Sequence, residues 1–226
     1  MANISVSPSI LNFLKNLEQN NNRDWFNDNK KQFKTVEKEV KLFFSAVKDN
    51  LTKHDDVDGL KVFRIYRDVR FSKNKAPYKT NFGCSFHRVK PKLRGGYYVH
   101  LQPNDQSFIA TGFWEPNKED LHRIRKEFEI DATEMRDILN LETLKSNWGN
   151  LEGDELKTAP KGFDKEHPAI DLIRKKQYLF IKKYTDKEVL APDFITNIDE
   201  AFKAIRPYFN YMSDVLTTDL NGVSLI

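Results

Sequence analysis

The sequence predicts an α+β fold, in which helices pack on a mainly antiparallel sheet, a meander of about four or five strands. Apolar residues recur at helical spacing over residues 8–52 and again after residue 117. Between these regions the period changes to two, in four short stretches separated by turn residues. No internal repeat or low-complexity linker interrupts the chain, so we expect residues 1–226 to form a single domain.

The composition is that of a folded chain with a sizeable core. Apolar residues make up 39% of the 226 positions and aromatic residues 12%, which argues against disorder. No apolar run approaches the roughly eighteen residues of a membrane-spanning helix, so we expect no membrane contact. The opening stretch MANISVSPSILNFLKNL lacks the basic region and cleavage site of a secretion signal.

The cysteine usage restricts both location and chemistry. Cys84 is the single cysteine, which excludes an intrachain disulfide and a multi-cysteine metal site. We therefore expect a reduced, cytoplasmic protein that uses neither a metal nor another cofactor. The sequence assigns no oligomeric state.

The N-terminal region predicts two or three helices. Ser7 is a natural N-cap and Pro8 suits the first helical position, ahead of an apolar stripe formed by Ile10, Phe13, Leu14 and Leu17. Asn22 or Asp24 can cap the next element, and residues 25–52 are typical of one or two amphipathic helices. The polar stretch HDDVDG at 54–59 ends this helical part.

Four strands are predicted next, at residues 63–71, 82–86, 97–101 and 108–114. In the last of these, the alternating set is Phe108, Ala110, Gly112 and Trp114. Turn signals NKAP, KPKLRGG and QPNDQ separate the strands. Cys84 alternates with Phe82 and Phe86, which indicates a core position rather than a nucleophile.

Helices return in the C-terminal half. Asn117 with Asp120, and Asp131 with Glu134, resemble capping boxes. We expect a loop over 157–168, a helix over 170–176 and a strand over 178–184. Two further helices, over 199–206 and 208–216, are predicted to break at Pro207.

Charge is distributed unevenly along the chain. Residues 61–100 carry eleven Lys and Arg against one acid, Asp68, a net charge of +10. The whole chain carries +4, so the remainder carries −6. This segregation indicates a local positive potential that attracts anions.

Within the predicted strand 63–71, three arginines have distinct orientations. Arg67 shares parity with the apolar residues, so it points into a cleft or to a carboxylate, unless a bulge turns it outward. Arg64 and Arg70 share the opposite face with Asp68. Because flanking cations hold a carboxylate ionised, Asp68 is a weak candidate for a catalytic base and a better spacer between the arginines.

The following stretch, KNKAPYKTNFG, resembles an anion-binding turn. Lys75, Tyr78 and Lys79 are its candidate ligand-binding residues, and Pro77 stiffens the loop. Neither GxxxxGK[ST] nor GxGxxG is present, so an ordinary solvated lysine turn stays the alternative.

The third predicted strand adds two candidates. Tyr98 and His100 lie on one face of it, where His100 is either a general acid or base or a structural histidine. The stretch HDDVDG fails as a calcium loop because its twelfth position is Ile65. No HExxH, GxSxG or Cys/His cluster is present, and the sequence does not decide whether the protein is an enzyme.

One string carries a family resemblance. FRIYRDVRFSKNKAPYKTNFG at 63–83, with NNNRDWF, GGYYVHLQP, GFWEP followed by RIR, and GDELKTAPKGFDKEHP, resembles domain of unknown function family 2461, a bacterial and fungal family. These motifs extend from about Ile10 to Pro207. The resemblance implies one domain and brings no activity, cofactor or catalytic residue.

The residues favour three hypotheses. The first is binding of a phosphorylated or other small anionic ligand, with Arg64, Arg67, Arg70, Lys75, Tyr78, Lys79, Tyr98 and His100 as the site. The second is a metal-free hydrolase or transferase that acts on such a ligand, with His100 or Asp68 moving the proton. The third is a surface for an acidic protein partner. Nucleic acid ranks below a small ligand, because the acidic remainder repels a long polyanion.

Overall fold

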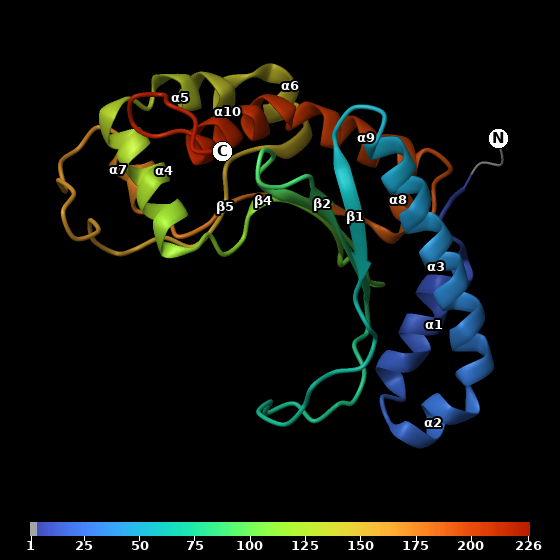
Figure 1. The fold of residues 1–226 in the computed structure, drawn as a ribbon. Coiled ribbons are helices and arrows are strands. Elements are labelled where there is room, and N and C mark those ends of the chain that lie inside the picture. Colours follow the sequence, from blue (N-terminus) through green and yellow to red (C-terminus); the bar gives the residue numbers. More distant parts are fainter. Residues whose placement is uncertain (1–3) are drawn as a thin grey trace.

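A five-stranded antiparallel sheet forms the centre of the molecule in the computed structural model, which describes residues 4–226. Its strands follow the chain order and comprise β1 (Val57–Val62), β2 (Phe82–Arg88), β3 (Gly96–Leu101), β4 (Ser107–Phe113) and β5 (Tyr178–Tyr184). The sheet is curved, and helices cover its convex face while the concave side stays open (Figure 1). The predicted α+β class and antiparallel meander are thereby confirmed.

The N-terminal helices are α1 (Pro8–Gln19), α2 (Arg23–Asp28) and α3 (Lys30–Leu51). Asn22 caps α2, because its side chain accepts a hydrogen bond from the Trp25 amide. Ser7 occupies the N-cap position of α1 as predicted, but its hydroxyl donates to the Glu39 carboxylate at 2.6 Å instead. The bond therefore links α1 to α3 rather than closing the helix end.

The first strand lies earlier in the chain than predicted. β1 occupies Val57–Val62, whereas residues 63–71 form no strand of the sheet. A register shift between Val57 and Gly59 lets the Asp- and Gly-containing stretch pair with β2. The last bond of this edge joins the Phe63 amide to the Gly83 carbonyl at 2.9 Å. Beyond it the chain leaves the sheet, and residues 63–71 pair instead with the following arm through an isolated bridge between Tyr66 and Tyr78.

The C-terminal half is helical around β5. Its helices are α4 (Lys118–Ile130), α5 (Thr133–Asn140), α6 (Glu142–Trp148), α7 (Ile170–Ile173), α8 (Asp186–Val189), α9 (Phe194–Ala204) and α10 (Arg206–Thr217). The Asn117 cap of α4 is confirmed, and residues 157–168 contain neither helix nor strand. Helix α5 starts after Ala132 rather than Asp131, and the break between the last two helices lies at Ile205. Pro207 sits in the first turn of α10, where its missing amide donor costs nothing.

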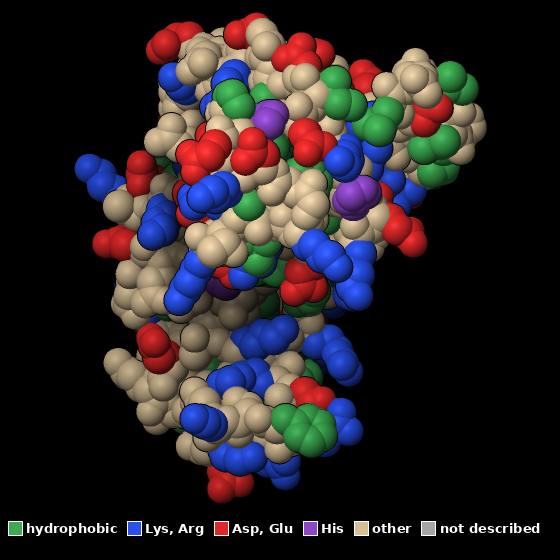
Figure 2. Space-filling model, turned by 90° about the vertical axis from the view of Figure 1, so that its left-hand side faces the viewer, with side chains coloured by type: hydrophobic (Ala, Val, Ile, Leu, Met, Phe, Trp, Pro, Cys, Tyr) green, Lys and Arg blue, Asp and Glu red, His purple; other side chains and the backbone are tan. Residues whose placement is uncertain are grey.

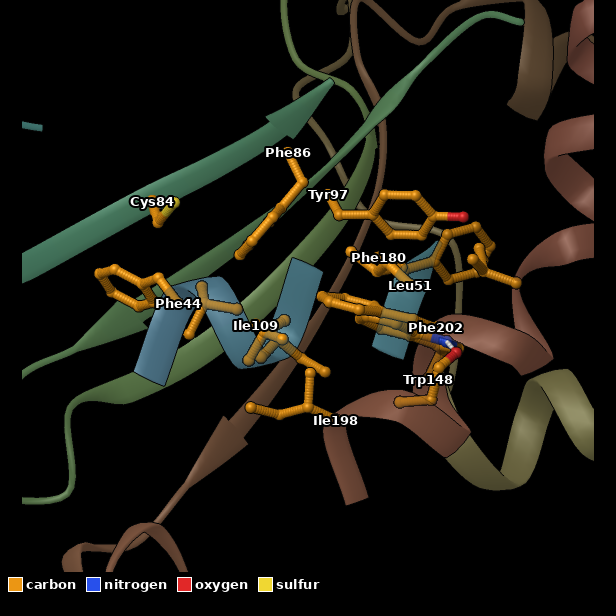
Figure 3. Close-up of a cluster of buried hydrophobic side chains, with 14 of the residues drawn as sticks. Phe44, Leu51, Cys84, Phe86, Tyr97, Ile109, Trp148, Phe180, Ile198 and Phe202 are labelled. Atoms are coloured by element: carbon orange, nitrogen blue, oxygen red, sulfur yellow. Dashed lines mark hydrogen bonds between the residues drawn. The ribbon is translucent and has the colours of Figure 1, made fainter. Parts of the chain in front are cut away.

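The core lies between the convex face of the sheet and the helices. Figure 3 shows Cys84, Phe86 and Tyr97 of the sheet directed toward Phe44 of α3 and Phe202 of α9. Cys84 is fully buried, and burial raises the pKa of its thiol to about 12, which confirms the predicted core position.

A buried ion pair connects the N-terminal helices, the sheet and α10. Arg88 of β2 donates to the Asp55 carboxylate at 2.7 Å, and neither side chain has any exposed surface. The Tyr97 hydroxyl donates to the same carboxylate at 2.5 Å, and Arg206 of α10 also contacts it. Asp55 lies between α3 and β1, so one carboxylate joins the N-terminal helices, the sheet and α10.

Across residues 4–226, none of the helices combines the length and apolar character needed to cross a membrane.

Candidate functional site on the concave face of the sheet

The open face of the sheet is formed by every second residue of its strands. Ser85, Tyr98 and Ala110 stand opposite one another on β2, β3 and β4, and the pair His100 and Phe108 follows. The predicted common face of Tyr98 and His100 is confirmed. The sequence pattern grouped Phe108, Ala110, Gly112 and Trp114 as the apolar side of this strand. In the structure the other set of β4 faces the helices, because Ile109 and Phe113 are buried there while Trp114, just after the strand, is 59% exposed.

This face contains a cavity of about 620 Å³. Eight ring-bearing residues line it, Phe63, Phe86, His87, Tyr97, Tyr98, His100, Phe108 and Trp114, although the Phe86 and Tyr97 side chains are themselves buried in the core. Figure 2 looks onto this side of the molecule and shows a hollow across its middle, with Lys and Arg side chains gathered on the lobe beneath it. A mainly apolar cavity of this size with a few polar groups is typical of a small-molecule site.

A second hollow of about 360 Å³ adjoins the first. Lys79 and Asn81 line both, so the two hollows adjoin at these side chains, and together they are called the depression. The smaller hollow adds Arg67 and several amide and hydroxyl side chains, and its acid is Glu18, which accepts a bond from Asn104 Nδ2 at 3.1 Å. A mainly apolar hollow therefore lies next to a polar one that contains two cations.

Residues 63–80 form an irregular hairpin that carries these cations. The Lys79 amide donates to the Ile65 carbonyl at 2.7 Å, and the Arg67 amide donates to the Pro77 carbonyl at 2.9 Å. Asn21, in the turn between α1 and α2, holds the hairpin by accepting from the Tyr78 amide and donating to the Tyr78 carbonyl. The Tyr78 ring stacks on Phe26 of α2 with centroids 4.0 Å apart.

Arg67 corrects the orientation expected from a regular strand. The strand is absent, yet the side chain is half-buried and lines the smaller hollow, where its guanidinium donates to the Ser72 hydroxyl at 3.3 Å. The cleft alternative therefore describes Arg67, and the structural ion pair does not.

The electrostatics of Lys79 reflect its surroundings. Burial lowers the pKa of its ammonium, and the positive charges of Arg64 and Arg67 lower it further. In the part of the chain that the structure describes, no carboxylate pairs with any of these three cations. The Lys79 ammonium also lies 5.6 Å from the centre of the Phe63 ring. This corner of the depression thus has a concentrated positive charge.

Other predicted ligand residues lie apart from the two hollows. Arg70 is paired with Asp68 at 2.7 Å, and both are exposed. This bond to Arg70 lowers the pKa of the Asp68 carboxyl, which makes it a poor base. Lys75 donates to the Val69 carbonyl at 3.1 Å, and Arg64 is exposed beside Lys79 without lining either hollow. Of the predicted set, Arg67, Tyr78, Lys79, Tyr98 and His100 line the depression.

His100 is a well-positioned neutral group. Burial lowers its pKa, so the uncharged ring predominates near neutral pH. Its Nε2 lies 2.8 Å from Gln102 Oε1, which assigns the ring proton to Nε2. Its Nδ1 then accepts from the Tyr98 hydroxyl at 3.1 Å, and the ring stacks on Phe108 at 4.5 Å. This network fixes the shape of the cavity floor.

Several lining residues were missed by the sequence predictions: Phe63, Asn81, Ser85, His87 and Phe108. Ser85 Oγ and His87 Nε2 lie 3.1 Å apart on β2, the one nucleophile-and-base pair in the larger hollow as described. Within the described chain no carboxylate bonds to His87, so the pair lacks the third group that orients a catalytic base. In the sequence, Ser85 and His87 alternate with the buried residues of β2, which was the signal that they share the open face with Tyr98 of β3.

Among the described residues, no three His, Cys, Asp or Glu side chains gather where they could hold a metal ion.

Comparison with known proteins confirms the resemblance seen in the sequence. The family model described as "Conserved hypothetical protein (DUF2461)" matches residues 9–211, nearly the whole chain. No curated protein and no solved structure matches this sequence significantly.

Proposed function

The chain belongs to the DUF2461 family, and from the geometry of its concave face we propose that it binds a small anionic ligand. The ligand's negative group lies in the smaller hollow against Arg67 and Lys79. Arg64 adds charge from the exposed side without lining the hollow.

The observation that carries this proposal is the state of the cations. Lys79 is half-buried beside two arginines, and its pKa is lowered because neither burial nor like charge favours the protonated form. Glu18 lines the same hollow, but among the described residues no ion pair joins it to Arg67 or Lys79, so the repulsion between these cations is uncompensated in the free protein. A phosphate or carboxylate compensates that repulsion, and the arginine fork matches its oxygens.

Binding ranks above the other hypotheses. No described residue completes a nucleophile, base and orienting acid in the depression, which disfavours a hydrolase or transferase. Arg67 and Lys79 line a hollow rather than a flat patch, which disfavours a surface for an acidic protein. A cytoplasmic location stays an expectation from the single cysteine.

Thermal unfolding in the presence of candidate anions tests the proposal. At a hundred times its dissociation constant, a ligand stabilises the folded state by about 2.7 kcal/mol, a rise in Tm of about 5 to 10 °C for a chain of this length. The panel contains inorganic phosphate, phosphorylated metabolites and carboxylates, each at two salt concentrations. Salt weakens binding at an exposed cation cluster more than at a buried one.

Matched variants assign any shift to the site. Arg67→Ala and Lys79→Met remove lining cations and are expected to abolish the rise in Tm. Lys73 lies in the same hairpin but is exposed and lines neither hollow, so Lys73→Ala should leave the rise in Tm intact. An equal loss in all three variants, or no shift with any anion, would contradict the proposal.

A further inference from the structure

The larger hollow is lined mainly by aromatic and apolar residues, and binding of an anion alone does not account for them. Its lining contains four half-buried rings that border open space, contributed by Phe63, Tyr98, His100 and Phe108. Two of these are packed face to face, and Phe63 meets Tyr98 edge-on with centroids 6.1 Å apart. A phosphate held against Arg67 and Lys79 leaves most of this volume of about 620 Å³ unfilled.

The floor beside these rings contains two adjacent glycines. Gly96 of β3 and Gly112 of β4 stand opposite each other, and Leu179 of β5 continues the row. Trp114 stands at the end of β4 and is 59% exposed. Both glycines and the exposed indole line the larger hollow, and at each glycine the backbone of a neighbouring strand approaches closely, so the sheet presents backbone to the hollow beside Trp114.

The rings and the cations are joined at one point. Lys79 and Asn81 line both hollows, and the Lys79 and Lys61 ammonium groups lie 5.6 and 5.4 Å from the centre of the Phe63 ring. A ligand that reaches from one hollow into the other therefore passes Lys79. It presents an apolar or planar part to the rings and a negative part to Arg67.

Resting on the proposed function, we infer that the ligand is a small phosphate ester that carries an aromatic ring, of the mononucleotide class. The ring stacks in the larger hollow, and the phosphate lies against Arg67 and Lys79. Stacking on aromatic side chains is tolerant of the base because every base has a π-face. The charge of −6 outside residues 61–100 opposes a long polyanion, so we commit to a single nucleotide.

Calorimetric titration separates the two parts of the ligand. The probes are inorganic phosphate, ribose 5-phosphate, phenyl phosphate, adenosine and uridine 5′-monophosphates, adenosine, and an eight-residue oligodeoxythymidine. We expect the monophosphates to bind at least about tenfold more tightly than ribose 5-phosphate, the contribution of one stacked base. Binding should also quench the fluorescence of Trp114.

Variants locate the ring. Phe108→Leu and Trp114→Leu keep apolar volume and are expected to weaken monophosphate binding about tenfold without changing ribose 5-phosphate binding. Phe71→Leu is the control, since this ring is 96% exposed and lines neither hollow. Because Trp114 is exposed, its variant keeps the test decisive if Phe108→Leu fails to fold.

The outcomes distinguish this inference from the proposal beneath it. If ribose 5-phosphate binds and no ring-bearing phosphate binds more tightly, the inference of an aromatic ligand fails while the proposal of anion binding stands. If adenosine binds as tightly as its monophosphate and phosphate does not bind, the anion site is wrong. If the oligodeoxythymidine binds over about tenfold more tightly than the monophosphates, the depression is a nucleic-acid groove and the single-nucleotide inference fails.

Discussion

Lys79 and His100 are the two titratable side chains whose surroundings most clearly set the chemistry of the depression. Both have a lowered pKa, and in both the first cause is burial. The consequence differs, because Lys79 stays the cation that an anion meets, whereas His100 stands as a neutral hydrogen-bonding group in the floor. A general-base role for His100 stays a prediction without support from its bonds, since both ring nitrogens are already engaged.

The pKa of His100 has a consequence for stability that can be measured. Its folded-state value lies below the ordinary 6.5, so the unfolded chain binds this proton more readily. The protein should therefore lose stability as the pH falls from about 6.5 toward the lower folded-state pKa, with a slope of at most about 1.4 kcal/mol per pH unit.

Urea unfolding from pH 7.5 to 5 checks this, with His100→Gln as the comparison. The variant should show a smaller decline in the free energy of unfolding over that window, whatever its stability at pH 7.5. His122→Gln is the control, since it changes an exposed histidine outside the depression. Parallel curves for the wild type and His100→Gln would show that His100 does not titrate as described.

At the scale of elements, the hairpin 63–80 is the part on which the candidate site depends. Two backbone bonds close it, and its attachment to the N-terminal helices runs through Asn21 and the Phe26–Tyr78 stack. Arg67 and Lys79 lie on opposite arms of this hairpin. The spacing of these cations therefore depends on contacts made by residues about sixty positions earlier in the chain.

Asn21→Ala is expected to loosen the hairpin more than it destabilises the molecule. It removes both bonds to the Tyr78 backbone, each worth about 1 kcal/mol, so the global loss should stay near 1–3 kcal/mol. Hydrogen exchange at the Arg67 and Lys79 amides should accelerate, and phosphate-ester binding should weaken.

Asn20→Ala provides the matched control for that experiment. Its amide donates only to the Asn16 carbonyl of its own helix, so the hairpin amides should exchange as in the wild type. Unchanged exchange at Arg67 and Lys79 in Asn21→Ala would refute the attachment.

The strand predictions show what periodicity can and cannot decide at this scale. The predictions for β2, β3 and β5 are confirmed, and each of these strands pairs with a neighbour over most of its length. Residues 63–71 have the same alternation, yet Ile65 is 3% exposed and Phe71 96%. Alternation states which residues share a side, whereas a regular strand requires pairing along its length, and this segment makes one isolated bridge, between Tyr66 and Tyr78.

For the whole molecule, the Asp55 cluster is the contact that joins regions distant in sequence. Arg88 and Tyr97 come from adjacent strands, and Arg206 comes from the last helix. Asp55 lies within the stretch that looked like half a calcium loop in the sequence. Its carboxylate instead compensates an arginine with no exposed surface.

Asp55→Asn should therefore destabilise the protein strongly. Arg88 keeps its burial but loses its counter-charge, which typically costs about 3–5 kcal/mol. Asp68→Asn makes the same change in the exposed pair with Arg70 and should alter stability by less than about 1 kcal/mol. Denaturant unfolding measures both, and a loss below about 1 kcal/mol for Asp55→Asn would contradict the structural role.

The sequence alone determined the fold class, most strands and helices, the burial of Cys84 and the stretch that holds the unpaired cations. These follow from local periodicity, capping residues and charge counting, which need no knowledge of neighbours in space. Tertiary structure alone decided which cations line a hollow. In the sequence, Arg70 and Lys75 are equivalent to Arg67 and Lys79. In the structure Arg70 pairs with Asp68 and Lys75 donates to the Val69 carbonyl, and neither lines a hollow. The aromatic floor also depended on which sheet face the helices cover, and that is settled by packing between residues far apart in the chain.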